Sequence, residues 1–453
     1  MLYLLAARAE SRTPLRVGLI GAGKFGTMFL SQARRVPGLH VLGVADLSRE
    51  RARGSLCRAE WPPEQFAATS FTQALKTGST YLTDDGESLI QADGLDVVVE
   101  ATGNLAAGIP YALKAFEHGR HVVMVNVEAD ALAGPLLAER AAAAGVVYSL
   151  AYGDQPALIC ELVEWARASG FEVVCAGKGT KYLPMYHTST PDTIWEHYGF
   201  SEEMVAQGDY NPRMFNSFLD GTKSAIEMAT VANATGLLPQ PEGLRFPPCG
   251  VDHLPHVCRP LSDGGQLAYK GTVEVVSSLE RDGRPVYRDL RWGVYVTFEA
   301  PSDYVRHCFA EYGLLTDSTG RYAALYRPYH LIGLELTISI LRVGLRGEAT
   351  GSPVGFKGDV AATAKRDLAA GEVLDGEGGY CVYGTLMPAE RAMRAGTLPI
   401  GLAHNVRLKN EVVAGEPIRW SDVEYDEADP VVRFRREMER RMTEDKQKCY
   451  PKS

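Results

Sequence analysis

The chain has 453 residues, of which 45% are hydrophobic and 23% are charged, and its formal net charge at pH 7 is -9. This composition is typical of a folded globular protein, and the length is enough for about three domains. The negative charge and the lack of a large basic cluster argue against a nucleic-acid-binding protein, and no apolar run reaches the ~18 residues of a membrane span.

Eight cysteines are spread along the chain, and no two are spaced as C-x-x-C. A zinc site or a disulfide framework is therefore not expected, and reduced thiols predict a cytoplasmic location. The apolar residues 1–7 lack the basic segment that begins a signal peptide, so we interpret them as a short N-terminal extension.

The first functional motif lies between residues 15 and 33, where an apolar run, a glycine-rich turn and an apolar-periodic segment follow one another. This order predicts a buried strand, a tight turn and a helix. The turn has the spacing G-x-G-x-x-G and consists of Gly21, Ala22, Gly23, Lys24, Phe25 and Gly26.

Each glycine of this turn has a mechanical role. Gly21 permits the tight turn, Gly23 lets a pyrophosphate approach the main chain, and Gly26 lets the helix pack on the sheet. Asp46 ends the next apolar run, 20 residues after Gly26, where a carboxylate meets a ribose hydroxyl. The pattern predicts a dinucleotide site; the alternative is a doubly wound domain whose turn binds no ligand.

The residues around Asp46 bear on the choice of cofactor. Its carboxylate favours the unphosphorylated ribose of NAD(H), because it repels a 2′-phosphate. Ser48, Arg49 and Arg51 follow closely and could bind that phosphate in NADP(H). These residues leave both cofactors open.

Residues 15–150 alternate apolar runs with helical patterns, which predicts a Rossmann-type doubly wound parallel sheet in a domain of residues 1–150. Two of the predicted strands, at 96–100 and 121–125, are followed by polar or small residues. Because ligands bind at the carboxyl ends of such strands, we expect these residues to line the cleft of the glycine turn. They are Thr102, Gly103, Asn104, Asn126 and Glu128. The alternative is that they only form turns.

Residues 151–350 are predicted to form a central α+β domain for catalysis and dimerisation. A strand at 171–176 runs into the segment GKGTKY at 177–182. Lys178 and Lys181 in this segment are candidates for binding an anion or polarising a carbonyl. The alternative is two solvated lysines in a flexible loop.

A long helix is predicted over residues 214–229, in which Asp220, Lys223 and Glu227 share one face. A lysine beside a carboxylate can hold a proton and pass it to a developing alkoxide, so Lys223 and Asp220 are candidate catalytic residues. The alternative is an exposed polar edge of the helix.

A third cluster follows in the same domain and contains Arg306, Tyr326 and Arg327. A guanidinium group binds two oxygens at once, so this cluster is a candidate site for a substrate phosphate or carboxylate. A subunit interface would be enriched in the same residue types. A buried helix is then predicted from Pro328 to Leu345.

Residues 351–453 differ in character and are predicted to form a small β-rich C-terminal domain. Residues 364–374 and 405–418 both read as a basic-apolar strand followed by Ala-Gly-Glu, and residues 431–446 carry mixed charges at helical spacing. This part of the chain resembles a SAF domain, whose role would be to cover a ligand or to make a subunit contact.

These motifs together resemble homoserine dehydrogenase over about residues 15–240. The likeness rests on the glycine turn, on EATG at 100–103, on VNVE at 125–128, and on the helix with Asp220 and Lys223. In that family a lysine and an aspartate of this helix act at the substrate oxygen.

Over nearly the whole chain, the sequence is similar to the homoserine-dehydrogenase-like proteins with a SAF domain that include the DXP reductoisomerase-like group. GKGTKY, FLDGTKSAIEMA at 218–229 and the C-terminal module carry this likeness. The group implies NADP(H), a homodimer, and reduction of 1-deoxy-D-xylulose 5-phosphate to 2-C-methyl-D-erythritol 4-phosphate in isoprenoid precursor synthesis. A divalent cation, Mg²⁺ or Mn²⁺, would suit the rearrangement, with Glu128, Asp154 and Glu227 as possible ligands.

Three functions follow from these patterns. The first is an NADPH-dependent reductase of a small phosphorylated carbonyl substrate. The second is a homoserine-dehydrogenase-type enzyme that acts on a semialdehyde or hydroxy acid. The third is a nucleotide-sensing binding protein without catalytic activity.

Overall fold

The computed structural model describes residues 1–207 and 210–449, and its chain forms two compact units. The first unit contains residues 1–161 and 330–354, and the second contains residues 162–329 together with those from 355 onward. Helix α8 (Gln155–Ala168) runs across the boundary between them.

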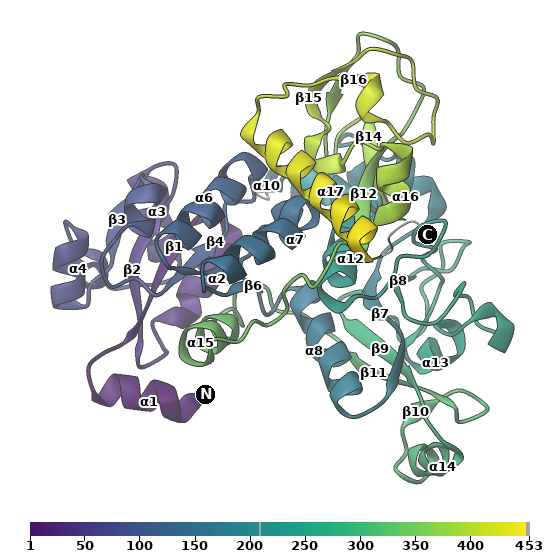
Figure 1. The fold of residues 1–453 in the computed structure, drawn as a ribbon, viewed down its shortest axis with the longest axis horizontal. Coiled ribbons are helices and arrows are strands. Elements are labelled where there is room, and N and C mark those ends of the chain that lie inside the picture. The colour runs from purple at the N-terminus through teal and green to yellow at the C-terminus, as the bar shows by residue number, and fades with distance from the viewer. Residues whose placement is uncertain (208–209, 450–453) are drawn as a thin grey trace. The chain divides into compact units, whose positions relative to one another are not determined.

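The first unit is built on a six-stranded parallel sheet (Figure 1). The strands, in spatial order, are β3 (Tyr81–Thr83), β2 (Leu39–Ala45), β1 (Leu15–Ile20), β4 (Val97–Glu100), β5 (His121–Met124) and β6 (Tyr148–Leu150). From β1 the next strands, β2 and β3, are added on one side, and β4, β5 and β6 are added on the other. The fold therefore has a topological switch point between β1 and β4, beside the glycine turn. The predicted Rossmann-type sheet is confirmed.

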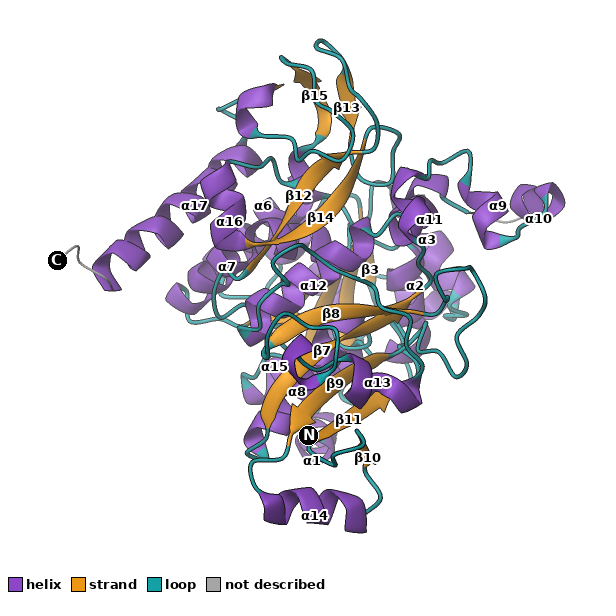
Figure 2. Ribbon diagram, turned by 90° about the vertical axis from the view of Figure 1, so that its right-hand side faces the viewer, coloured by secondary structure: helices purple, strands orange, loops and turns teal. Residues whose placement is uncertain are grey.

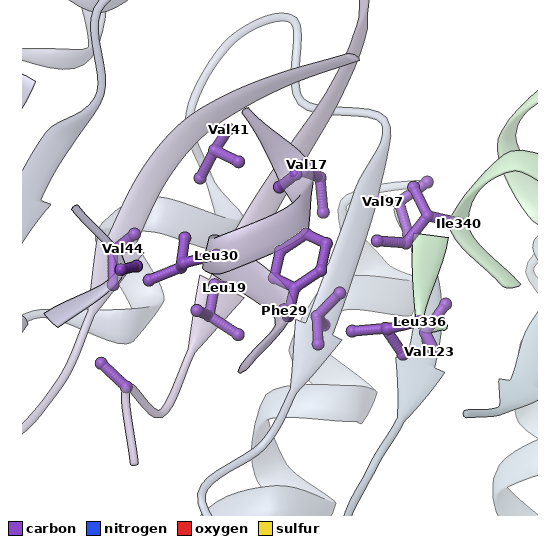
Figure 3. Close-up of a cluster of buried hydrophobic side chains, with 14 of the residues drawn as sticks. Val17, Leu19, Phe29, Leu30, Val41, Val44, Val97, Val123, Leu336 and Ile340 are labelled. Carbon is purple, nitrogen blue, oxygen red and sulfur yellow. The ribbon is translucent and has the colours of Figure 1, made fainter. Parts of the chain in front are cut away.

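Helices cover both faces of this sheet. They are α1 (Leu2–Glu10), α2 (Lys24–Ala33), α3 (Arg49–Arg58), α4 (Phe71–Thr77), α5 (Gly86–Ile90), α6 (Leu105–Glu117), α7 (Val127–Ala143) and α15 (Thr337–Arg346), with a 3-10 turn at Pro63–Phe66. Phe29 and Leu30 of α2 pack with Leu336 and Ile340 on one face of the strands (Figure 3).

The position of α15 differs from the prediction in two respects. The helix begins at Thr337 instead of Pro328, because Gly333 adopts a left-handed turn with φ +68° close to the main chain of Phe25. It also packs on the sheet of the first unit, which sequence spacing alone could not show. Its apolar face, with Leu336 and Ile340, completes the core beside β1 and β4.

The second unit contains a five-stranded mixed sheet. Its strands, in spatial order, are β10 (Leu315–Thr316), β11 (Tyr322–Arg327), β9 (Val294–Glu299), β7 (Glu172–Thr180) and β8 (Thr272–Ser277). Only β7 and β8 are parallel to each other among the paired strands. Its helices are α9 (Ile194–Tyr198), α10 (Glu202–Gln207), α11 (Pro212–Leu219), α12 (Thr222–Thr235), α13 (Leu254–Val257) and α14 (Asp303–Glu311).

The C-terminal part of this unit is rich in β-structure, as predicted. One two-stranded antiparallel sheet pairs β12 (Gly358–Ala364) with β14 (Val382–Pro388), and a small antiparallel sheet joins β13 (Val373–Asp375), β15 (His404–Leu408) and β16 (Val423–Glu424). The helices here are α16 (Ala389–Ala395) and α17 (Pro430–Cys449). Figure 2 shows α12 between the β12–β14 sheet and the β7–β8 edge of the larger sheet, and α12 contacts all four strands.

The single helix predicted over residues 214–229 is wrong, because the structure has two helices there. The first ends at Leu219 and the second begins at Thr222. Gly221 has φ +90°, a left-handed conformation that glycine adopts without strain, and it breaks the helix. Asp220 and Lys223 therefore lie on opposite sides of a break and do not share one helical face.

None of the helices in residues 1–207 and 210–449 is both long and apolar enough to cross a lipid bilayer.

Candidate active site

The glycine turn has the conformation that its sequence requires. Gly21 has φ +98°, and a side chain there would collide with the carbonyl oxygen of Ala101. A Cβ on Gly26 would lie 2.5 Å from the Gly21 carbonyl oxygen, whereas nothing lies within 4 Å of the Cβ position at Gly23. Lys24 and Phe25 form the first turn of α2. The open space at Gly23, beside a helix N-terminus, fits a dinucleotide pyrophosphate.

Asp46 tethers this turn. Its Oδ2 accepts the Ala22 N–H at 2.7 Å, and its Oδ1 accepts the Leu47 N–H at 2.7 Å. The Nε of Arg51 lies 3.1 Å from the same Oδ1, and only 6% of the Asp46 side chain is exposed. Since Arg51 offsets the carboxylate charge and is itself 62% exposed, the repulsion between Asp46 and a 2′-phosphate is weakened.

The predicted residues after β4 and β5 lie at the same sheet edge as the turn. Asn104 caps α6 by accepting the Ala107 N–H at 3.2 Å, and Asn126 caps α7 by accepting the Ala129 N–H at 3.1 Å. Gly103 has φ +65° and open space around it. The two asparagines thus have structural roles as helix caps, whether or not they also contact a cofactor.

Glu100 is a buried acid at the end of β4 that the sequence analysis left without a role. Its Oε1 accepts hydrogen bonds from the main-chain N–H of Thr102, at 3.0 Å, and from the Thr102 hydroxyl. Gly108 of α6 leaves room for it, since a Cβ there would lie 2.9 Å from Oε2. Burial raises the pKa of Glu100 to about 7, although both bonds from Thr102 lower it.

We expect replacement of Glu100 by glutamine to stabilise the protein more at pH 8 than at pH 5. In the folded wild type the pKa is raised from 4.5 to about 7, so the folded state retains a proton that the unfolded state releases in this window. The contribution of Glu100 to the stability of the wild type therefore falls as the pH rises from 4.5 to 7, by up to on the order of 3 kcal/mol. Urea unfolding of both proteins at the two pH values measures the difference. An equal difference at both pH values would contradict this assignment.

Lys178 and Glu227 form a buried ion pair in the second unit. Lys178 lies on β7 with 6% of its surface exposed, and its Nζ donates a hydrogen bond to Oε2 of Glu227 on α12, which is 4% exposed. Gly177 and Gly179 flank the lysine, and their lack of side chains lets the carbonyls of neighbouring segments approach β7 closely. The pair places an ammonium group and a carboxylate together in the interior of the unit, an arrangement that can hold and pass a proton.

The other predicted lysine, which directly follows β7, has different partners. The Nζ of Lys181 donates to the carbonyl oxygen of His197 and lies 5.5 Å from the centre of the Tyr198 ring. Burial lowers the pKa of Lys181, and the positive charge of Arg291 lowers it further. The structure therefore separates the two lysines that the sequence analysis grouped together.

Asp220 is fully buried and forms an ion pair with a lysine of the C-terminal domain. Its Oδ1 accepts the Thr222 N–H at 2.9 Å, and its Oδ2 lies 2.7 Å from Nζ of Lys365. Lys365 is also buried and donates to the carbonyl oxygens of Ser189 and Gly379, each at 2.8 Å. This position does not support contact between Asp220 and a substrate, and it gives the carboxylate a role in holding the segment after β12 against the break between α11 and α12, within the second unit.

Lys223 remains a candidate. It lies in the first turn of α12, is half-buried, and precedes Glu227 by four residues on the same helix. Residues at this spacing lie next to each other on a helix surface. The predicted lysine and carboxylate on one helical face are therefore Lys223 and Glu227, with Asp220 outside the set.

The structure does not bring the predicted phosphate cluster together. Arg306 on α14 is ion-paired with Asp303 at 3.3 Å, and its side chain packs beside Gly320, before β11 begins. Tyr326 and Arg327 are the last two residues of β11. At the rise per residue of an extended chain, they lie about 20 Å from Gly320.

Two residues of the second unit were missed because only the tertiary structure reveals their role. Lys365 follows strand β12 and is followed in the chain by charged residues, so no local sequence pattern predicts that its side chain is buried. His187 is wedged between the Tyr182 hydroxyl at 2.9 Å and the Asp220 carbonyl oxygen at 2.7 Å. Burial lowers the pKa of His187, which favours its neutral form.

The predicted metal ligands do not form a site in the part of the chain that the structure describes. No group of three or more His, Cys, Asp or Glu side chains there is arranged to hold a metal ion. Glu227, one of the three candidates, is bound by Lys178.

Three family profiles match successive parts of the chain. Residues 17–150 match the NAD binding domain of homoserine dehydrogenase, residues 153–336 match the catalytic domain of oxidoreductase DRL, and residues 360–424 match the SAF domain. A comparison with curated proteins gives no match.

Several solved structures resemble the chain in part. Homoserine dehydrogenase from Thiobacillus denitrificans is 20% identical over 49% of each chain, with a TM-score of 0.35. A probable dehydrogenase from Thermotoga maritima is 16% identical over 75% of this chain and 91% of that chain, with a TM-score of 0.38. A DOX-P reductoisomerase with fosmidomycin and magnesium is 15% identical over 49% and 58%, with a TM-score of 0.34. The match thus spans about half the length of the homoserine dehydrogenase.

Proposed function

We propose that this chain, which combines a homoserine-dehydrogenase-type NAD-binding domain with a DRL catalytic domain and a SAF domain, is an NAD(P)-dependent oxidoreductase of the DXP reductoisomerase-like group. Its substrate would be a small phosphorylated carbonyl compound, either 1-deoxy-D-xylulose 5-phosphate or a related sugar phosphate. The observation that carries the proposal is the buried Lys178–Glu227 pair, because reduction of a carbonyl requires a proton donor at its oxygen.

The residues have separate tasks in this reaction. Gly21, Gly23 and Gly26 would hold the dinucleotide. Its reduced nicotinamide would supply a hydride to the aldehyde carbon that forms when the α-hydroxyketone rearranges, or directly to the carbonyl carbon of a substrate that needs no rearrangement. Lys178 stabilises the negative charge that develops on the oxygen and donates the proton that completes the alcohol. Glu227 keeps the ammonium group of Lys178 in place and balances its charge. No step is assigned to Asp220.

A metal ion is not part of this assignment. The described residues do not bring three predicted ligands together, so no step is routed through Mg²⁺ or Mn²⁺. The divalent cation, the homodimer, the cytoplasmic location and the role in isoprenoid precursor synthesis stay predictions.

Turnover assays distinguish the three functions. The proposal expects NADPH oxidation with 1-deoxy-D-xylulose 5-phosphate and formation of 2-C-methyl-D-erythritol 4-phosphate, identified by mass spectrometry. Oxidation with aspartate semialdehyde instead would support the homoserine-dehydrogenase-type function. Tight binding of NADPH without turnover of any carbonyl compound would favour the nucleotide-sensing protein.

We favour NADP(H) over NAD(H), since Arg51 is exposed at the position expected for a 2′-phosphate. Replacing Arg51 with alanine should raise KM for NADPH about tenfold or more, because a charge-assisted bond to phosphate is lost. KM for NADH should change little. Arg53→Ala is the matched control, since Arg53 lies on the same helix but over the Phe66 ring, at 5.6 Å. Equal effects of Arg51→Ala on both cofactors would exclude this role.

A further inference from the structure

Glu100 ends β4 at the point of the sheet where the glycine turn begins. It is the register partner of Ile20 on β1, the residue directly before Gly21. The main-chain N–H of Ala101 donates to the Ile20 carbonyl oxygen at 2.8 Å. A Cβ on Gly21 would collide with the Ala101 carbonyl oxygen and lie 2.8 Å from the main-chain nitrogen of Thr102. The segment that follows Glu100 is therefore packed directly against the glycine turn.

The Glu100 carboxyl group holds this segment in place. Its Oε1 accepts the main-chain N–H of Thr102 at 3.0 Å and also accepts the Thr102 hydroxyl. The hydroxyl oxygen of Thr102 in turn accepts the main-chain N–H of Asn104 at 3.2 Å. One oxygen of a carboxyl group can accept these bonds whether the other oxygen is protonated or not. Protonation therefore changes the charge beside the turn and leaves the hydrogen bonds of the segment in place.

The surroundings of this carboxyl group disfavour a negative charge on it. Its side chain is fully buried, and among the side chains that the structure describes it forms no ion pair with a lysine, an arginine or a histidine. On α6 it lies beside Gly108, whose Cβ position is 2.9 Å from Oε2 of Glu100 and 2.8 Å from Nδ2 of Asn126. The titratable groups that act on it from neighbouring helices and strands are acids and phenols: Tyr111 of α6, Glu128 of α7 and, with its hydroxyl bonded to Asp130, Tyr148 of β6.

Near neutral pH this acid has two populated forms in the free protein. Burial raises the pKa of Glu100 to about 7, the two bonds from Thr102 lower it, and the charge of Glu128 raises it. A dinucleotide brings the two negative charges of its pyrophosphate to the N-terminus of α2, which begins at Lys24. Because β1 and β4 are neighbouring parallel strands, those charges would lie at the same edge of the sheet as an ionised Glu100 and would repel it.

We propose that Glu100 is a positioning residue that links dinucleotide binding to proton binding: the acid is neutral in the complex, so the protein takes up a proton from the solvent when the dinucleotide binds. The neutral acid keeps its bonds to Thr102 and removes the repulsion between carboxylate and pyrophosphate. Dinucleotide affinity should therefore be highest below pH 7 and should fall as the pH rises through this range. The inference rests on dinucleotide binding, and on neither the substrate nor the proton donor of the proposed function.

Calorimetric titration of the full-length protein with NADH tests this link without any turnover. NADH is the probe because the 2′-phosphate of NADPH itself titrates near pH 6. The number of protons taken up is measured at pH 7.5 in buffers of different ionisation enthalpy. Wild-type protein should take up about half a proton per NADH, and its Kd should rise about tenfold between pH 6 and pH 9.

Two variants assign the proton to Glu100. Glu100→Gln replaces the acid by a neutral amide whose oxygen still accepts the bonds from Thr102, so it should bind NADH with no proton uptake and with a Kd that is independent of pH. Glu117→Gln is the matched control, because Glu117 is an exposed acid of α6 that pairs with Lys114 at 3.6 Å. It should show the proton uptake and the pH dependence of the wild type.

A third variant separates the link from a merely structural role of Glu100. Thr102→Val removes the hydroxyl bond that lowers the pKa of Glu100 and keeps the main-chain bond. The pH at which Kd for NADH changes should therefore move upward, which loss of packing alone would not cause. Circular dichroism shows that each variant is folded.

The proposal is overturned by a wild type that binds NADH without proton uptake, by uptake that persists in Glu100→Gln, or by a midpoint that does not move in Thr102→Val. These outcomes are distinct from those of the turnover assays. Proton-linked NADH binding without turnover of any carbonyl compound would contradict the proposed function alone. Turnover together with NADH binding that does not depend on pH would contradict the link alone.

Discussion

Replacement of Lys178 by methionine is expected to lower kcat/KM for carbonyl reduction by about a thousandfold, since general acid catalysis contributes 10²–10⁴-fold. Lys178 is the buried ammonium group on β7, and methionine has a similar volume without a proton to donate. Steady-state NADPH oxidation measures the loss. The single variant also leaves Glu227 as an unpaired buried carboxylate, which should destabilise the protein by roughly 3–5 kcal/mol.

A double variant separates chemistry from folding. Lys178→Met combined with Glu227→Leu removes both charges, so it should regain most of the stability lost by the single variant while remaining inactive. Lys270→Met is a matched control, because Lys270 also forms an ion pair with a glutamate, Glu299 of the same sheet. It should keep near-wild-type kcat. A stable double variant with wild-type kcat would show that Lys178 is not the proton donor.

Replacement of Asp220 by asparagine is expected to have the second large effect, which is a loss of stability. The carboxylate is buried and ion-paired with Lys365, so its loss leaves a buried ammonium group and should cost about 3–5 kcal/mol. Lys365→Met should be destabilising to a similar extent. Thermal and urea unfolding of the full-length protein measure both variants.

The same pair tests whether Asp220 takes part in the reaction. In the double variant Asp220→Leu with Lys365→Met, most of the lost stability should return, and kcat should stay within about tenfold of the wild-type value, because neither group reaches the substrate. If Asp220 is an acid or base at the substrate oxygen, this double variant would be stable but inactive. That result would restore the role implied by the resemblance to homoserine dehydrogenase.

The nucleotide-binding unit could be predicted from sequence because its signals are local. The glycine turn, the buried runs at β1, β4 and β5, and Asp46 all lie within one stretch of chain, and each specifies its own conformation. The β-rich C-terminal domain was likewise marked by its paired segments. The break between α11 and α12 was missed, although Gly221 stands at the break, because the apolar pattern on both sides continues at helical spacing.

The candidate site of the second unit could be predicted only in part. Lys178, Lys181 and Glu227 were identified as functional residue types, but their pairing depends on how α12 packs against β7, which no spacing in the sequence reveals. The same holds for Lys365 and Asp220, which are 145 positions apart in the chain (365 − 220). Arg306 and Arg327 were grouped because either guanidinium group could bind a phosphate or carboxylate, yet the length of strand β11 separates them.

The most direct test of the account is a single-turnover reaction with NADPH that carries deuterium on the transferable position of its nicotinamide. With 1-deoxy-D-xylulose 5-phosphate and wild-type protein, mass spectrometry should find one deuterium on the carbon of the new alcohol. In the time of one wild-type turnover, the folded Lys178→Met, Glu227→Leu variant should transfer almost none. A wild-type protein that binds NADPH but places no deuterium in any carbonyl compound would contradict the account, and so would undiminished transfer by the double variant.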